Sequence, residues 1–191
     1  MDFEKYADFV INYPLLFIYK NKVHKNSNNK TFGDFMKGKL SEANNELPGT
    51  KDLELHLSTI FTEVRLKKYI EMRSIDACEW DCHCAGPAFY TGLVYGNLDE
   101  ILDLIKDWKS EDVLKAYIDA PKKGLETKIK GKSILEWGKI LLKLSYKGLQ
   151  DRNFENKDGK NETIFLKNVE QILQQNKTKA EKTLENLNQK K

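Results

Sequence analysis

The chain has 191 residues, 40% of them hydrophobic and 32% charged, which is the composition of a globular domain with one ordinary core. Its 32 basic and 29 acidic side chains are interspersed and give a formal charge of +3, so no basic stripe of the kind that binds nucleic acid stands out. No apolar run approaches the roughly 18 residues of a membrane helix, so neither nucleic acid nor a membrane is expected as a partner.

The first third of the chain alternates short helices with a hairpin. Apolar residues at helical spacing precede Pro14, and an apolar run from Leu15 to Tyr19 leads into a polar turn at Asn21. Thr31 is placed to cap a further short helix. The predicted order is a helix over 2–12, a hairpin over 15–24, a helix over 31–38, a loop over 41–51 and a helix over 52–61.

The next segment, Glu63–Asp76, reads as one strand with side chains alternating between two faces. Its apolar face can pack on helices, although Lys68 interrupts it. Its polar face carries carboxylate and guanidinium groups about 7 Å apart along the strand. The polar face comprises Glu63, Arg65, Lys67, Tyr69, Glu71 and Arg73, and the apolar face comprises Val64, Leu66, Ile70 and Met72.

This polar face admits two interpretations. Carboxylates hold Mg²⁺, which usually bridges to substrate phosphates, and arginine binds carboxylates and phosphates through its planar fork. The face therefore suits a reaction in which a carboxylate substrate meets ATP. Alternatively, it is a solvated surface on which neighbouring pairs such as Glu71 and Arg73 offset each other.

All three cysteines lie in one short loop with a histidine, at Cys78, Cys82, His83 and Cys84. The spacing is unlike the paired ligands of structural zinc sites, so a loop with small buried thiols competes with a zinc-binding interaction domain. An odd cysteine count predicts no disulfide framework. Because the start of the chain lacks the features of a signal peptide, we expect a cytoplasmic location and reduced thiols.

The second half reads as helical nearly to its end. Pro87 suits a helix start, and Asn97 and Ser110 stand where N-caps belong. An apolar stripe marks a helix over 133–148, with Lys139, Lys143 and Lys147 on another face; a polar loop over 151–161 and two further helices follow. Strands segregated from helices predict an α+β fold, namely part of an antiparallel β-sheet with packed helices, followed by an all-helical C-terminal half. A sheet of two or three strands is only marginally stable by itself, and we therefore expect these strands to belong to a larger sheet.

The run HLSTIFTEVRLKKYIEMR resembles the stretch HLTTIFPEVRLKRYLEMR of glutamate–cysteine ligases of the plant and proteobacterial type. Further likenesses extend over essentially the whole chain, in TFGDFMKGKL, in PAFYTGLVYGNLDEILDLIKDW and in TKAEKTLE. The resemblance implies a glutamine-synthetase-like ligase fold. It also implies ATP-dependent ligation of the glutamate γ-carboxylate to the cysteine amine, the first step of glutathione biosynthesis.

The same resemblance implies roles for single residues. Glu71 is similar to a catalytic Mg²⁺ ligand, and Arg73 to a catalytic contact of the γ-phosphate or acyl phosphate. Arg65 and Tyr69 are implied to contact substrate or ATP. His56 matches a family histidine to which we assign helix packing at least as readily as a site role. The implied small molecules are glutamate, cysteine, ATP and Mg²⁺.

Members of this family are more than twice as long as this chain. We therefore interpret residues 1–191 as the C-terminal portion of one ligase catalytic domain, with 1–85 contributing to the active-site sheet and 86–191 helical. The chain is then expected to be a fragment that is inactive alone and lacks its partner, the N-terminal part of the ligase. The alternative is a non-catalytic helical binding or regulatory module derived from the ligase.

Overall fold

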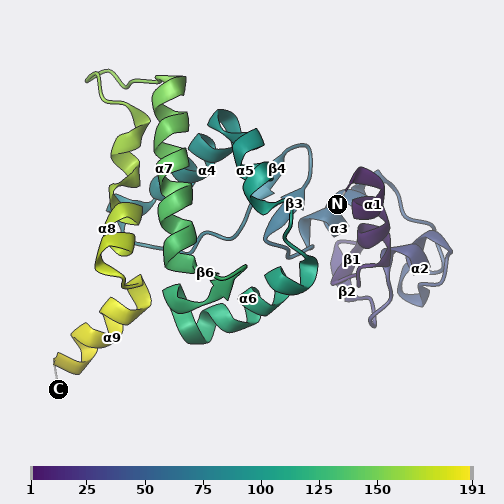
Figure 1. The fold of residues 1–191 in the computed structure, drawn as a ribbon. Helices are drawn as coiled ribbons and strands as arrows, with labels where there is room; N and C mark the ends of the chain where they lie inside the picture. Colours follow the sequence, from purple (N-terminus) through teal and green to yellow (C-terminus); the bar gives the residue numbers. More distant parts are fainter. Residues whose placement is uncertain (1, 190–191) are drawn as a thin grey trace. The chain divides into compact units, whose positions relative to one another are not determined.

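The computed structural model describes residues 2–189 and divides into two compact units, Met1–Asp76 and Ala77–Lys191. The elements of the first unit are α1 (Phe3–Asn12), β1 (Phe17–Lys20), β2 (Val23–Asn26), α2 (Phe32–Met36), α3 (Thr50–Ser58), β3 (Val64–Leu66) and β4 (Ile70–Met72) (Figure 1). Its core packs apolar side chains from the β1 side, α2 and the segment after α2, namely Leu15, Ile18, Phe32, Phe35, Leu40 and Ala43.

Local sequence signals explain most of this unit. Asp2 caps α1 by accepting the Lys5 backbone N–H at 2.8 Å, and Thr31 forms a capping box with Asp34 at the start of α2. The hairpin predicted over 15–24 is confirmed as β1 and β2, which turn through two residues of positive φ at Asn21 and Lys22.

The prediction of a single strand over Glu63–Asp76 is wrong. The chain folds back on itself, so that β3 and β4 form an antiparallel hairpin. The Lys67 backbone N–H donates to the Tyr69 carbonyl at 2.9 Å and closes the turn around Lys68. Lys68 is the residue that interrupted the apolar face, and it lies at the reversal instead of on a packed surface.

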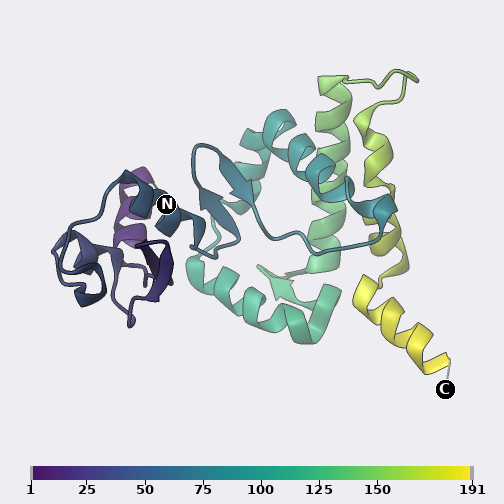
Figure 2. The same cartoon turned by 180° about the vertical axis from the view of Figure 1, so that it is seen from behind.

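The second unit is built around the long helix α7, which contacts both α4 and α8 (Figures 1 and 2). Ser133 caps α7 through a capping box with Glu136. The predicted faces of this helix are confirmed, since Trp137 and Leu144 are buried while its three lysines are exposed. The elements are α4 (Ala85–Gly96), α5 (Leu98–Ile105), α6 (Ser110–Lys123), β5 (Lys128–Ile129), β6 (Lys132–Ser133), α7 (Ile134–Arg152), α8 (Lys167–Gln175) and α9 (Lys179–Gln189).

Helices α4 and α7 approach so closely that side chains are excluded at their crossing. A Cβ added to Gly148 would lie 1.9 Å from the Gly92 carbonyl oxygen. Asn97 fixes the same crossing by donating its side-chain N–H to the Leu144 carbonyl at 2.9 Å. Asn97 therefore does not cap α5 with its side chain as predicted, and Ser110 is the first residue of α6, one position after its N-cap Lys109.

The α+β fold class is confirmed. Each sheet in the described part of the chain has only two strands, and one of them, β5 with β6, lies in the half that was expected to be helical. Among residues 2–189, no helix is both long enough and apolar enough to cross a membrane.

Candidate functional site

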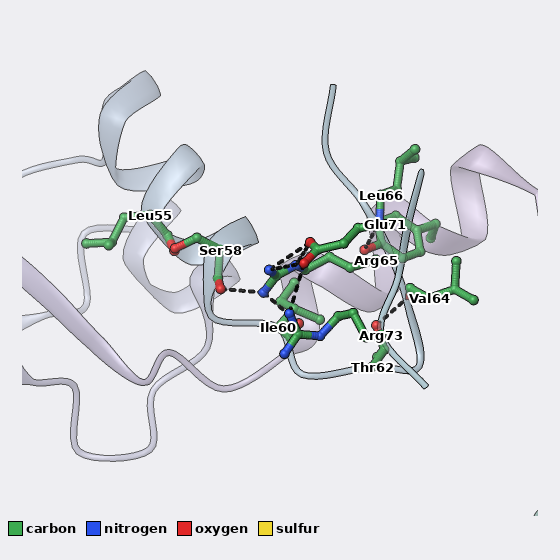
Figure 3. A network of polar contacts seen from close by, with 10 residues as sticks. Leu55, Ser58, Ile60, Thr62, Val64, Arg65, Leu66, Glu71 and Arg73 are labelled. Carbon is green, nitrogen blue, oxygen red and sulfur yellow. Dashed lines mark hydrogen bonds and ion pairs between the residues drawn. The ribbon is translucent and has the colours of Figure 1, made fainter. Parts of the chain in front are cut away.

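The β3–β4 hairpin brings Arg65 directly opposite Glu71. The two side chains form a two-pronged ion pair, in which Arg65 Nε lies 2.8 Å from Glu71 Oε2 and Arg65 Nη2 lies 3.1 Å from Oε1 (Figure 3). Arg73 joins from the same face and places its Nη1 3.1 Å from Glu71 Oε1. One carboxylate thus lies between two guanidinium groups, a cluster that we call the Arg–Glu–Arg cluster (Arg65, Glu71 and Arg73).

The two arginines of this cluster differ in their surroundings. Arg65 is 6% exposed, and its Nη1 donates to the Ile60 carbonyl at 3.3 Å and also to the Ser58 carbonyl. All three nitrogens of its guanidinium are therefore engaged by acceptors of the protein. Arg65 acts as a bracket between α3 and Glu71 and has no hydrogen-bonding nitrogen left over for a substrate.

Arg73 is the accessible arginine. Its side chain remains 29% exposed, and its guanidinium carbon lies 5.5 Å from the centroid of the exposed Phe61 ring. Within residues 2–189, Nη1 is the one guanidinium nitrogen of Arg73 for which the structure shows a hydrogen bond. Hydrogen bonds from Arg65 hold the pKa of Glu71 below its ordinary value, with a smaller contribution from Arg73. Glu71 is therefore ionised at neutral pH.

Two other residues named by the resemblance lie apart from this cluster. Tyr69 is at the turn of the hairpin, with its side chain exposed. His56 is buried, stacks on Phe32 with ring centroids 4.9 Å apart, and places Nε2 2.8 Å from the Val10 carbonyl. These contacts support helix packing as the role of His56.

Magnesium is poorly matched by the residues that this chain presents. Both oxygens of Glu71 already accept guanidinium N–H groups, and the cluster carries one more positive charge than negative. In the part of the chain that the structure describes, no group of three or more His, Cys, Asp or Glu side chains is arranged to hold a metal ion. A metal at Glu71 would need acidic ligands from outside this chain, so we derive no step through it.

The cysteine loop differs from the expectation of reduced thiols. Cys78 and Cys82 form a disulfide, with their Cα atoms 6.1 Å apart, and Cys84 is a free, exposed thiol. The i to i+4 separation across a short 3₁₀ turn brings these two residues within disulfide reach. His83 points Nδ1 at the Glu79 carbonyl, 3.0 Å away.

Comparison with known proteins shows the family to which this chain belongs. The family model described as glutamate-cysteine ligase family 2 (GCS2) matches residues 1–191. The chain belongs to this family. It is 38% identical over 185 residues to a chloroplastic glutamate–cysteine ligase of Solanum lycopersicum, covering 96% of this chain and 34% of that protein. For chloroplastic ligase A of Oryza sativa subsp. indica, the identity is 38% over 95% of this chain and 36% of the relative.

A similar likeness, 37% over 97% of this chain, holds for the chloroplastic ligase of Arabidopsis thaliana. The chain thus spans about a third of the length of the curated relatives that it matches. All three are described as chloroplastic, which contradicts the predicted cytoplasmic location, and we withdraw that prediction. It rested on the first residues of a chain that matches only part of its relatives.

Sequence reasoning missed three contributors to the site. The Ser58 and Ile60 carbonyls that bind Arg65 are backbone atoms and leave no mark in the sequence. Phe61 was assigned to the preceding helix, although α3 ends at Ser58 and Phe61 lies beside Arg73. The sequence signal that could have indicated this contact is that Phe61 is an aromatic residue two positions before the charged segment that begins at Glu63.

Proposed function

We propose that this chain supplies part of the active site of a glutamate–cysteine ligase that consumes ATP and yields γ-glutamylcysteine, ADP and phosphate. The observation that supports the proposal most directly is a family match over all 191 residues that includes an ionised carboxylate between two arginines. In this reaction the glutamate γ-carboxylate attacks the terminal phosphoryl group of ATP. The cysteine amine then attacks the resulting acyl phosphate, so that a C–N bond forms, phosphate leaves and the nitrogen loses a proton.

The three side chains of the Arg–Glu–Arg cluster take different roles in this proposal. Arg73 binds an anionic oxygen of ATP or of the acyl phosphate with its remaining N–H groups, since a guanidinium is matched to phosphate oxygens. Glu71 orients Arg73; it would contribute to a Mg²⁺ site only together with acidic ligands from outside this chain, since both of its oxygens accept guanidinium N–H groups here. Bound Mg²⁺ would neutralise phosphate charge.

Arg65 holds Glu71 in place and is a positioning residue. This role replaces the substrate contact that the resemblance implied, because the Arg65 nitrogens are engaged and its side chain is buried. For Tyr69 we retain a substrate contact as a proposal, which its exposed place at the turn permits.

The roles of Glu71 and Arg73 can be tested in a chimera in which residues 1–191 replace the matching segment of the tomato relative. We expect Arg73→Ala to lower turnover by about 100-fold or more, because one charge-stabilising donor contributes that much in comparable sites. Glu71→Gln should also lower turnover, because the carboxylate that accepts from Arg73 and orients it is lost. Lys67→Ala, in the turn of the same hairpin, is the matched control and should retain turnover. If either cluster variant kept normal turnover, a non-catalytic module would be the better description of this chain.

A further inference from the structure

Phe61 is an exposed aromatic residue beside the accessible arginine of the Arg–Glu–Arg cluster. It is 61% exposed, whereas the preceding Ile60 is buried. The centroid of its ring lies 5.5 Å from the guanidinium carbon of Arg73, within the range of a cation–π contact. Phe61 thus contributes little to the apolar core, and its ring contacts the side chain that we propose to bind a phosphate oxygen.

Glu71 and Phe61 support the Arg73 guanidinium in different ways. Glu71 accepts a hydrogen bond from Nη1, which fixes one edge of the planar group. The face of the Phe61 ring carries partial negative charge and attracts the guanidinium that lies over it. Together the two contacts restrict a long and flexible side chain before a ligand arrives, and they leave its remaining N–H groups available for an anion.

Arg65 fixes both of these supports. Its Nε and Nη2 hold the Glu71 carboxylate at 2.8 and 3.1 Å. Its Nη1 donates to the carbonyls of Ser58 and Ile60, which lie just before Phe61 in the chain (Figure 3). One buried guanidinium therefore ties the segment that carries the aromatic ring to the carboxylate of the cluster, so that the ring and the carboxylate are placed together.

We propose that Phe61 is a positioning residue of the ligase, and that its ring holds the Arg73 guanidinium ready for an anionic phosphate oxygen. This inference rests on the proposed function, because the anion is taken to be that of ATP or of the acyl phosphate. A donor that is held in place before charge develops needs less reorganisation in the transition state. Loss of the ring should therefore lower turnover more than it changes the KM for glutamate.

The first measurement follows the Arg73 side chain in residues 1–191 alone, where catalysis plays no part. Nitrogen relaxation of its Nε–H group reports how tightly the guanidinium is held. Phe61→Leu keeps an apolar side chain but removes the ring, and it should lower the order parameter of Arg73. Phe61→Trp keeps an aromatic face and should retain the order of the parent protein. Tyr69→Leu removes an exposed ring at the hairpin turn, away from the cluster, and is the matched control that should change nothing.

The second measurement uses the chimera with the tomato relative and asks whether the electrons of the ring matter. Stepwise fluorination of phenylalanine at position 61 withdraws negative charge from the ring face and changes the shape of the side chain little. Turnover should fall with each added fluorine. For Phe61→Leu it should fall by about threefold or more, which matches the modest strength of an exposed cation–π contact. A ring that only packs against its neighbours would give the same turnover throughout the fluorinated series.

Two results would overturn the proposal: an unchanged order parameter of Arg73 in Phe61→Leu, or a turnover that does not follow the fluorinated series. Arg73→Ala in the same chimera tests the proposed function separately. If that variant kept normal turnover, the catalytic assignment of Arg73 would fail, and the relaxation measurement would still decide whether the Phe61 ring holds the guanidinium.

Discussion

Arg65 and Arg73 belong to the same face of one hairpin, yet only Arg65 is buried. The alternating sequence predicts the same exposure for both arginines, because nothing in it distinguishes a guanidinium enclosed by backbone carbonyls from one at the surface. The two therefore differ in what their loss would do: Arg65 supports the structure of the site, and Arg73 is available for binding.

Arg65→Ala is predicted to loosen the hairpin. It leaves the Ser58 and Ile60 carbonyls without a donor, and a buried acceptor left unsatisfied costs about 1–3 kcal/mol. Backbone amides of β3 and β4 should then exchange faster with solvent, which residue-resolved hydrogen exchange measures. Arg73→Ala is the matched control and should change exchange far less; equal effects would contradict the bracket role of Arg65.

His56 makes the first unit sensitive to acid. Burial lowers its pKa below the usual value of 6.5, only partly offset by the hydrogen bond to the Val10 carbonyl, and its Nδ1 has no partner among the described residues. The unfolded chain therefore binds a proton more readily, and the free energy of unfolding should fall as the pH drops below about 6.5. Above that pH the residue contributes no pH dependence.

This expectation is measured by following amide exchange in α3 between pH 7 and pH 5. His56→Gln keeps a side-chain N–H for the Val10 carbonyl but does not titrate, so its stability should vary less over that range. Identical pH profiles for the two proteins would show that His56 is not the responsible group.

At the scale of the element, the faces of Glu63–Asp76 were predictable and its path was not. The turn of the β3–β4 hairpin contains three residues, an odd number, so residues of equal parity still share a face after the chain reverses. An uninterrupted strand and a hairpin with such a turn thus have the same alternation. Lys68, a charge on the apolar face, marked the position where they differ.

The α4–α7 crossing depends on a glycine pair that the sequence does not single out. Replacing a helical glycine with alanine usually stabilises a helix by about 0.5–1 kcal/mol. At Gly148 the new methyl group would meet the Gly92 carbonyl at 1.9 Å, and forced overpacking costs about 1–3 kcal/mol. Gly148→Ala should therefore lower the melting temperature measured by circular dichroism.

The exposed Lys143 of the same helix provides the control, because Lys143→Ala changes α7 away from the crossing. That variant should melt close to the parent protein. An unchanged melting temperature for Gly148→Ala would mean that α4 and α7 can separate without cost.

At the scale of the whole molecule, the chain spans about a third of the length of the ligases that it matches. We predict that isolated residues 1–191 release no ADP in response to glutamate and cysteine, because positioning of all reactants is most of what such an enzyme supplies. A coupled ADP assay with ATP and Mg²⁺ checks this, with an intact plant ligase as the positive control. Substrate-dependent ADP release by the chain alone would contradict the prediction.

The sequence supported the family and fold class because residue identities and periodic patterns extend over its whole length. It could not supply the division after Asp76, since that depends on which side chains share a core. Nor could it supply the pairing of Cys78 with Cys82, which depends on the local path of the loop. The chloroplast location is a description of the complete relatives, and no residue pattern that we identified in this chain indicates it.

The two units also differ in what spectroscopy can detect. All three tryptophans, Trp80, Trp108 and Trp137, lie in the second unit, together with six of the nine α-helices found in residues 2–189. Tryptophan emission is therefore silent about the first unit, and far-ultraviolet dichroism is weakly sensitive to it. A variant in which the first unit is unfolded would therefore give nearly normal tryptophan emission and far-ultraviolet dichroism. Its loss of activity would then be mistaken for a chemical effect at the Arg–Glu–Arg cluster.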